Sequence, residues 1–319
     1  MPINKVQFQP GMSISEFMER FGSEEQCAAA LEKFRWPQGF RCPRCQGSQC
    51  YRIAPSPTHC TLLQCTACRH QASLTAGTVL DSTKLPLRKW FLAFYLTSQA
   101  KTGLSSLALM RQLGVSYRTA WLVQQKIRCV MAQADQAHRL QGEVQVDDAY
   151  LGGEHPGAGG RGSPNKVPII AAVSLNRQGH PLYVKMSPLA GFTNEAVKKW
   201  AAASLVPGTN VLSDGLACFA AVIDADCAHS YVVVGDRKPR DMPLFRWVNT
   251  VLGNLKTMIN GAHKSFKFRK YAALYLGAFN YRFNHRFQLA RLVTDVITDA
   301  VRTTPRTEYA IRGRAEVHA

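Results

Sequence analysis

The sequence predicts an α/β fold with a mixed sheet, preceded by a small cysteine-rich module and an all-helical region. Three observations support this. Seven of the ten cysteines lie before residue 70, helical patterns interrupted by a glycine follow, and residues 142–260 then alternate between strand and helix patterns. Strands followed by alternating helices and strands are typical of an α/β domain.

The composition indicates a folded and strongly basic chain. Of 319 residues, 46% are hydrophobic, which supplies a core and excludes disorder as the main state. No apolar run reaches the roughly 18 residues of a membrane span, and the start lacks a secretion-signal pattern, so we expect a cytoplasmic protein. The net charge of +18 divides into +3, +7, +1 and +7 over residues 1–80, 81–141, 142–260 and 261–319. Basic flanks around a nearly neutral middle favour a polyanionic partner such as nucleic acid.

Two Cys-x-x-Cys pairs predict a structural zinc site. Cys42 and Cys45 form the first pair, and Cys65 and Cys68 form the second. Each pair can place two thiolates on one turn, and two facing turns give the tetrahedral four-sulfur site that Zn²⁺ accepts. We therefore expect a zinc ribbon over about residues 35–75, in which the metal stabilises a unit too small to build a core. Other side chains that could replace a nominal ligand are Cys50, Cys60, His59 and His70.

Residues 81–141 predict a helix-turn-helix region. Residues 86–100 begin with Pro and have the apolar spacing of a helix with one buried face. Ser105 can cap a second helix, Gly114 makes the turn, and Ser116 caps a third helix. The last helix of such a motif enters the major groove of DNA. We expect base or phosphate contacts from Tyr117, Arg118, Thr119 and Gln124; an ordinary three-helix core with a solvated basic face is the alternative.

The order of the strands and helices expected over residues 142–260 indicates one type of sheet. Strands are expected at 143–148, 166–175, 181–186, 210–214 and 230–234, and helices at 194–204, 216–225 and 244–259. Three antiparallel strands followed by alternating helices and strands give an RNase-H-like mixed sheet, in which the first and fourth strands lie side by side.

Aspartates end these two neighbouring strands. Asp147 closes the first strand and Asp214 the fourth, so the two carboxylates would meet at one edge of the sheet. Carboxylates this close are stable with bound metal or a raised pKa. Two Mg²⁺ (or Mn²⁺) ions there would activate a nucleophile and stabilise the leaving oxygen of a phosphodiester. The alternative is that both aspartates are turn formers at strand ends.

The third metal ligand stays open at this point. Residues 242–263 contain no acid, but Asn249 and Lys256 share one helix face. An amide oxygen such as that of Asn249 can bind Mg²⁺, and Lys256 could contact a phosphate. Asn249 could instead cap the helix. Other candidate ligands are Asn254, Asp236 and Asp241.

The C-terminal part combines basic and aromatic residues. Between residues 264 and 291 we expect a helix whose aromatic side chains pack on the sheet and whose basic outer face, with Arg282 and Arg286, lies along DNA. Simple core packing with solvated charges is the alternative. Residues 303–319 show no pattern and are expected to be frayed. The expected domains are 1–80, 81–141 and 142–290, with a tail at 291–319.

Nine short motifs run in the order of a known family over about residues 15–290. They lie at residues 35–45, 75–78, 86–90, 112–115, 119–121, 146–153, 212–215, 248–256 and 281–284. The chain thereby resembles the insertion-sequence transposases of the 1595 family, which combine an N-terminal zinc ribbon with a DDE-superfamily catalytic domain.

The resemblance implies a function and a set of site residues. It implies a transposase that binds the terminal inverted repeats of its element, hydrolyses a phosphodiester to free a 3′-hydroxyl and joins that end to target DNA. A homo-oligomer on DNA in the bacterial nucleoid is expected. Asp147 and Asp214 match the family's two aspartates, and Asn249 with Lys256 resembles a variant of its third position. Relatives commonly have Glu where this chain has Ala278. The alternative is therefore a catalytically inactive or repurposed transposase that acts as a DNA-binding protein.

Overall fold

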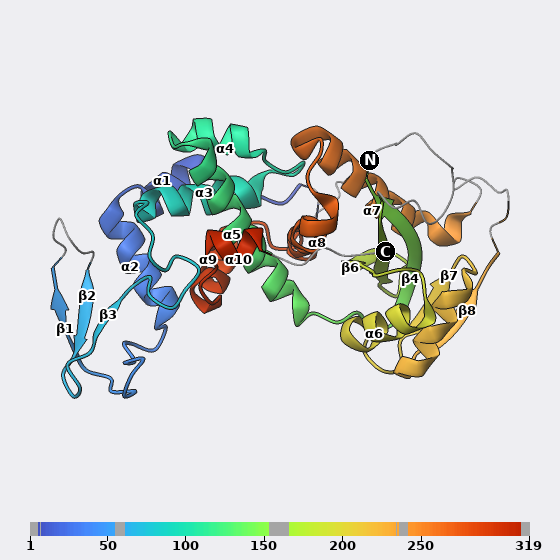
Figure 1. Cartoon of the computed structure of the whole chain (residues 1–319), viewed down its shortest axis with the longest axis horizontal. Coiled ribbons are helices and arrows are strands. Elements are labelled where there is room, and N and C mark those ends of the chain that lie inside the picture. The colour runs from blue at the N-terminus through green and yellow to red at the C-terminus, as the bar shows by residue number, and fades with distance from the viewer. Residues whose placement is uncertain are drawn as a thin grey trace. The chain divides into compact units, whose positions relative to one another are not determined.

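The structure is a computed structural model in which residues 6, 8–54, 61–152, 166–233, 235 and 242–313 are described. It divides into two compact units (Figure 1). The first unit comprises residues 1–101, 106–130 and 287–311, and the second comprises 102–105, 131–286 and 312–319. Among the described helices, none has the length and apolar character that crossing a membrane requires.

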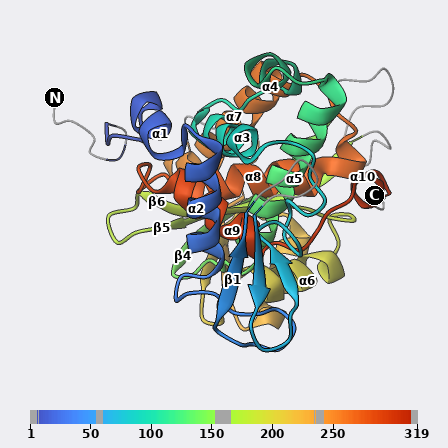
Figure 2. The same ribbon diagram turned by 90° about the vertical axis from the view of Figure 1, so that its left-hand side faces the viewer.

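The first unit begins with two helices and a small sheet. Helices α1 (Ile14–Phe21) and α2 (Glu24–Arg35) start at serines whose side chains accept backbone N–H groups of the first turn. Strands β1 (Cys50–Ile53), β2 (Leu62–Cys65) and β3 (Gln71–Ser73) form an antiparallel sheet in the order β1-β2-β3 (Figure 2). This sheet confirms the predicted ribbon.

The rest of the first unit is helical: the helices within residues 81–141 were predicted, whereas a helix after residue 291 was not. It contains α3 (Leu87–Gln99), α4 (Ser106–Leu113), the first part of α5 (Tyr117–Gln136), and α9 (Leu292–Arg302). Gly114 turns the chain between α4 and α5 with a φ of 59°, and the Ser116 hydroxyl accepts the Thr119 N–H at 3.2 Å. Leu109 and Leu113 form the buried face of α4, whereas Leu107 is half exposed.

The C-terminal segment is more ordered than we expected. Helix α9 packs on α2 and α3 through buried Val293, Val296 and Ile297. A further helix, α10 (Glu308–Arg312), lies in the range predicted to be frayed. Thr307 caps its first turn by accepting the Ala310 N–H at 3.0 Å, and Ile311 is buried. The expectation of a frayed end was wrong for α10, because a single buried isoleucine is too weak a periodic signal.

The second unit contains a five-stranded mixed sheet in the order β6-β5-β4-β7-β8. Its strands are β4 (Glu143–Leu151), β5 (Val167–Leu175), β6 (Pro181–Pro188), β7 (Asn210–Ser213) and β8 (Ala228–Tyr231). Strands β4, β5 and β6 pair antiparallel, whereas β7 is parallel to β4 and β8 is parallel to β7. The predicted RNase-H-like fold and the neighbouring first and fourth strands are confirmed.

Helices cover both faces of this sheet (Figure 1). One face packs on α6 (Asn194–Ser204) and on η1 (Ala217–Ala225), which is a 3₁₀ helix where we expected an α-helix. The other face packs on α7 (Arg246–Met258) and α8 (Phe268–Asn284). Strand β5 is buried on both faces, which explains its nearly continuous apolar sequence.

Two asparagines of α8 complete the hydrogen bonding of the edge strand β6. The Asn280 amide accepts the Met186 N–H and donates to the Met186 carbonyl, both at 3.1 Å. Asn284, one turn later, does the same with Val184 at 2.8 and 3.0 Å. Asn280 also donates to Asp135, which is buried and forms an ion pair with Lys185 at 3.2 Å. The amides thus replace the backbone of a neighbouring strand.

Replacing Asn280 by Leu is expected to lower the free energy of unfolding by about 3 kcal/mol, because the substitution leaves the backbone groups of Met186 unpaired and removes a donor from Asp135. Asn280 is 1% exposed, so water cannot replace these bonds. Urea unfolding measures the loss. The same change at the exposed Asn254 is the control, and equal effects of the two substitutions would contradict the bonding role.

Candidate metal centres and nucleic-acid interface

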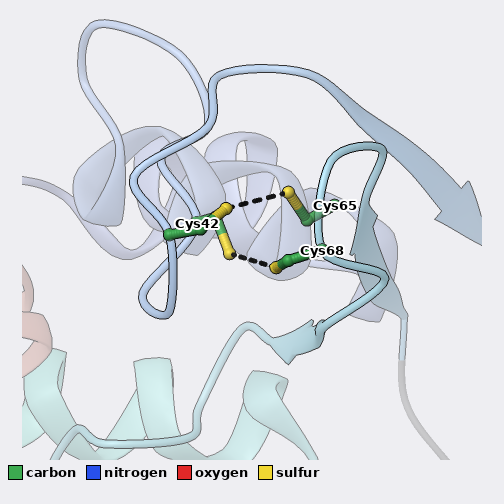
Figure 3. Close-up of side chains that lie close together, drawn as sticks. Cys42, Cys65 and Cys68 are labelled. Atoms are coloured by element: carbon green, nitrogen blue, oxygen red, sulfur yellow. Dashed lines mark hydrogen bonds between the residues drawn. The ribbon is translucent and has the colours of Figure 1, made fainter.

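Four thiols of the ribbon converge on one point. The sulfur atoms of Cys42, Cys45, Cys65 and Cys68 all lie within 4.8 Å of one another, and three of them are labelled in Figure 3. The Cys42–Cys68 and Cys45–Cys65 sulfur distances are 3.6 and 3.5 Å. A tetrahedron with Zn–S bonds of about 2.3 Å has edges of roughly 3.8 Å. The four thiols therefore fit a structural Zn²⁺ site.

The two Cys-x-x-Cys turns share one hydrogen-bonding pattern. In the first, Gln46 N–H donates to the Cys42 carbonyl at 2.9 Å; in the second, Arg69 N–H donates to the Cys65 carbonyl at 3.0 Å. Gln46 and Arg69 have positive φ values of 63° and 60°. A Cβ added at Gly47 would lie 3.3 Å from the Cys65 sulfur, so glycine leaves room for the thiol cluster. The backbone conformation of each turn thus directs its two cysteine sulfurs toward the other turn.

The environment favours thiolate formation at two of the four cysteines, Cys42 and Cys65. Burial raises the pKa of Cys42, but the N–H groups of Cys45 and Arg44 and the Cys68 thiol outweigh it and lower the pKa to about 7. The backbone N–H of Cys68 lowers the pKa of Cys65. At Cys45 the Gly47 N–H lowers the pKa, but the Cys68 and Cys65 thiols and burial outweigh it and raise the pKa to about 12. Since thiolates are the metal-binding form of cysteine, the shifts of Cys42 and Cys65 assist zinc binding.

The spare ligand candidates stand apart from this cluster. Cys50 is the register partner of Cys65 in the sheet, but it does not belong to the group of converging sulfurs. His70 accepts the Cys65 N–H through its backbone carbonyl. His59 and Cys60 lie outside the described residues.

A second cluster forms at the carboxyl end of β7, beside the middle of β4; Asp147 does not close its strand as expected, because β4 continues to Leu151 in its pairing with β5. Asp147, Asp148 and Asp214 each place a carboxylate oxygen within 4.8 Å of the other two. The parallel pairing sets Gln145 beside Leu212, so Asp147 and Asp214, each two residues further on, reach the same level. Asp214 is held by a turn in which its carboxylate accepts the Leu216 N–H at 3.2 Å. The structure therefore brings together the two aspartates expected to meet.

Asp148 is the member of this cluster that we did not predict as a ligand. In a regular strand, alternation sends the side chains of two successive residues to opposite faces. The Asp147 carboxylate, however, accepts the Asp148 N–H at 2.9 Å. Its side chain therefore bends along the strand toward Asp148 instead of pointing straight away from the sheet. An acid directly after the first aspartate was the available signal. Three half-buried carboxylates this close repel one another, and a divalent cation would relieve that repulsion.

The remaining metal-ligand candidates lie on or before α7. This helix packs on the face of the sheet toward which Asp147 alternates, since Ala171, the register partner of Asp147, belongs to the core shared with α7. Asn249 is half-buried, whereas Asn254 and Lys256 are exposed. Asp236 and Asp241 lie outside the described residues. Ala278, at the position of the missing glutamate, is buried within α8.

Of the residues of α5 that we expected to contact DNA, only those in its first turn are accessible. Tyr117 and Arg118 are exposed, and the Thr119 hydroxyl is hydrogen bonded to that of Ser116 at 2.9 Å. The expected exposure of Gln124 was wrong: it is 1% exposed and accepts the Ser106 hydroxyl at 2.7 Å. All side chains of α5 from Val123 to Met131 are buried. This part of α5 is therefore an interior helix, not a surface helix with one exposed face.

Arginines near the end of α8 also face the protein. Arg286 donates to the carbonyls of Pro181, Leu182 and Phe283, and burial lowers its pKa to about 10. Arg282 donates to the Ala278 carbonyl at 3.3 Å. The expected place of Arg286 on a basic outer face was wrong, because Arg286 satisfies backbone carbonyls at the start of the edge strand β6.

Comparison with known proteins agrees with both candidate centres. Residues 139–284 match the ISXO2-like transposase domain, and residues 22–71 match the transposase zinc-ribbon domain. A stretch of 135 residues is 31% identical to an uncharacterized protein in transposable element ISH50 of Halobacterium salinarum, covering 42% of this chain and 44% of that protein. The matched region therefore spans less than half of that relative's length. The chain thus carries, in this order, the zinc-ribbon domain and the transposase domain of IS1595-type transposases.

Proposed function

We propose that the protein is an active DNA transposase. It binds the terminal inverted repeats of its element, hydrolyses a phosphodiester to free a 3′-hydroxyl and transfers that end to target DNA. The observation that carries the proposal is the cluster of Asp147, Asp148 and Asp214 beside the carboxyl end of β7, within the domain that matches the transposase family. Because two ends must be joined in one complex, we expect at least two copies of the chain on DNA.

The acidic cluster suits Mg²⁺ or Mn²⁺, because hard cations prefer carboxylate and amide oxygens. Asp147, Asp148 and Asp214 would hold the ions, with Asn249 as a further oxygen ligand. When bound, two such ions activate the attacking oxygen and stabilise the leaving oxygen. The exposed Lys256, on the same helix as Asn249, would bind a phosphate of the DNA.

DNA recognition would fall to the first unit. The exposed side chains at the start of α5, Tyr117 and Arg118, point to a short contact rather than a whole recognition helix. A zinc ribbon with exposed arginines at its knuckles, Arg41, Arg44 and Arg69, adds phosphate contacts.

Cleavage of DNA that carries the element's ends tests the proposal. Purified protein with Mg²⁺ or Mn²⁺ is expected to nick that DNA and leave a 3′-hydroxyl, whereas DNA without the ends stays intact. Salt-dependent binding to the ends without any metal-dependent nicking would contradict catalysis and support the DNA-binding alternative.

Neutralising Glu308 is expected to strengthen DNA binding about threefold at low salt. Glu308 of α10 holds the Arg118 guanidinium through bonds of 3.2 and 2.9 Å, so a DNA phosphate must compete with this carboxylate. Fluorescence anisotropy with Glu308→Gln measures the gain. Glu16→Gln, which removes an equal charge from the exposed Glu16–Arg20 pair, is the control. An equal gain from Glu308→Gln in an Arg118→Ala background would show a general charge effect instead.

A further inference from the structure

Gln145 joins the strand of the first aspartate to the start of α7. Its side-chain amide donates to the Leu244 carbonyl and its Oε1 accepts the Val248 N–H at 3.1 Å. Gln145 is 5% exposed, so water does not compete for either bond. A buried amide paired on both sides fixes its two partners at the same time.

The Gln145 side chain caps the start of α7. The first N–H groups of a helix have no partner within the helix, and Val248 is the third residue of α7. Phe245, which precedes the helix, makes no side-chain capping bond. The cap therefore comes from a residue 103 positions away in the sequence. Apolar packing of Phe245 and Val248 holds the helix against the sheet, but such contacts are non-directional and do not fix its position along the axis.

The same strand and helix carry the proposed metal ligands. Gln145 precedes Asp147 by two residues, so both side chains alternate to the face on which α7 packs. Asn249 directly follows Val248, whose N–H Gln145 holds. We infer that Gln145 is a positioning residue: it sets the placement of α7 along β4 and thereby brings the Asn249 amide to the metal held by Asp147 and Asp214. This inference rests on the proposed function.

Divalent-cation binding by the full chain, with its structural zinc in place and no other metal added, tests the inference without any catalysis. Mn²⁺ alone is the probe, followed by the electron paramagnetic resonance signal of the free ion. Gln145→Met keeps the size of the side chain but removes both hydrogen bonds, and is expected to weaken Mn²⁺ binding about tenfold, as the loss of an outer-shell partner does. If Gln145→Met fails to fold, Gln145→Asn, which is one methylene too short to span both partners, takes its place.

A double substitution separates positioning from a general loss of stability. In an Asn249→Ala background, Gln145→Met is expected to have no further effect on Mn²⁺ affinity, because the ligand that it positions is gone. Val251→Ala, which removes buried volume from the same helix, lowers the melting temperature without touching the cap and is expected to leave the affinity unchanged.

The possible failures point to different errors. If Asp147→Asn abolishes Mn²⁺ binding while Gln145→Met retains wild-type affinity, the inference is wrong and the proposed metal site stands. An equal weakening by Gln145→Met with and without Asn249 would also overturn it. If Asp147→Asn binds Mn²⁺ like the wild type, the carboxylate site itself, and the proposed function with it, is wrong.

Discussion

Replacing Asp147 or Asp214 by Asn is expected to lower metal-dependent DNA cleavage by roughly a thousandfold or more. Either change removes one of the clustered carboxylates, so the cations that promote hydrolysis lose a ligand. DNA binding is expected to stay within a factor of about two, since neither aspartate is among the side chains proposed to contact DNA. Gel analysis of nicked product and anisotropy of bound DNA measure the two quantities.

The free energy of unfolding, measured with zinc bound but without Mg²⁺ or Mn²⁺, gives a second test of the same substitutions. Carboxylates within 4.8 Å of one another repel, so neutralising one is expected to raise the free energy of unfolding by about 1 kcal/mol in the absence of Mg²⁺ or Mn²⁺. Mn²⁺ is expected to stabilise the wild type and to have little effect on the variants.

Asp224→Asn is the matched control for both readouts. Asp224 is a surface aspartate 55% exposed that pairs with Lys198 at 3.3 Å, outside the cluster. Full cleavage activity in Asp147→Asn, or an equal loss in Asp224→Asn, would contradict the assignment of the site.

Replacing Cys42 or Cys65 by Ser is expected to release the zinc and unfold residues 40–70. Each of these cysteines supplies one of four converging thiols, and structural zinc contributes about 10–16 kcal/mol to the folding of small zinc modules. Zinc content per chain and protection of the ribbon from proteolysis measure the loss.

Cys50→Ser is the control for the ribbon. Cys50 lies across the sheet from Cys65 but outside the thiol cluster, so this variant is expected to keep its zinc. Unchanged zinc content in Cys42→Ser, or zinc loss in Cys50→Ser, would show that the ligands are misassigned.

The features predicted from the sequence are those that local patterns determine. The two Cys-x-x-Cys pairs place their own sulfurs through short turns, so spacing alone identified the cluster. The neighbouring positions of Asp147 and Asp214 followed from the order of strands, since the first and fourth strands pair in this fold. Helix α6 occupies the predicted residues 194–204 because a threonine cap and a clear apolar face define it.

The features that were missed depend on contacts between distant segments. Gln124 has the polarity of a surface residue, but Ser106 pairs with it in the interior. Arg286 looks like a DNA ligand until the carbonyls of the edge strand β6 are placed beside it. Asp148 joins the acidic cluster against strand alternation. The partners of Gln124 and Arg286 lie far along the chain, so residue type alone gave the wrong surroundings for these two side chains.

The asparagines that pair with β6 restrict how two copies of this domain can associate. An incoming strand needs unpaired N–H and carbonyl groups along an edge, and those of Val184 and Met186 are already occupied by side-chain amides of α8. A strand from another chain therefore cannot pair with β6 and extend the sheet at this edge. A dimer that extends the sheet across its symmetry axis would have to be built from the opposite margin, where β8 is the last strand.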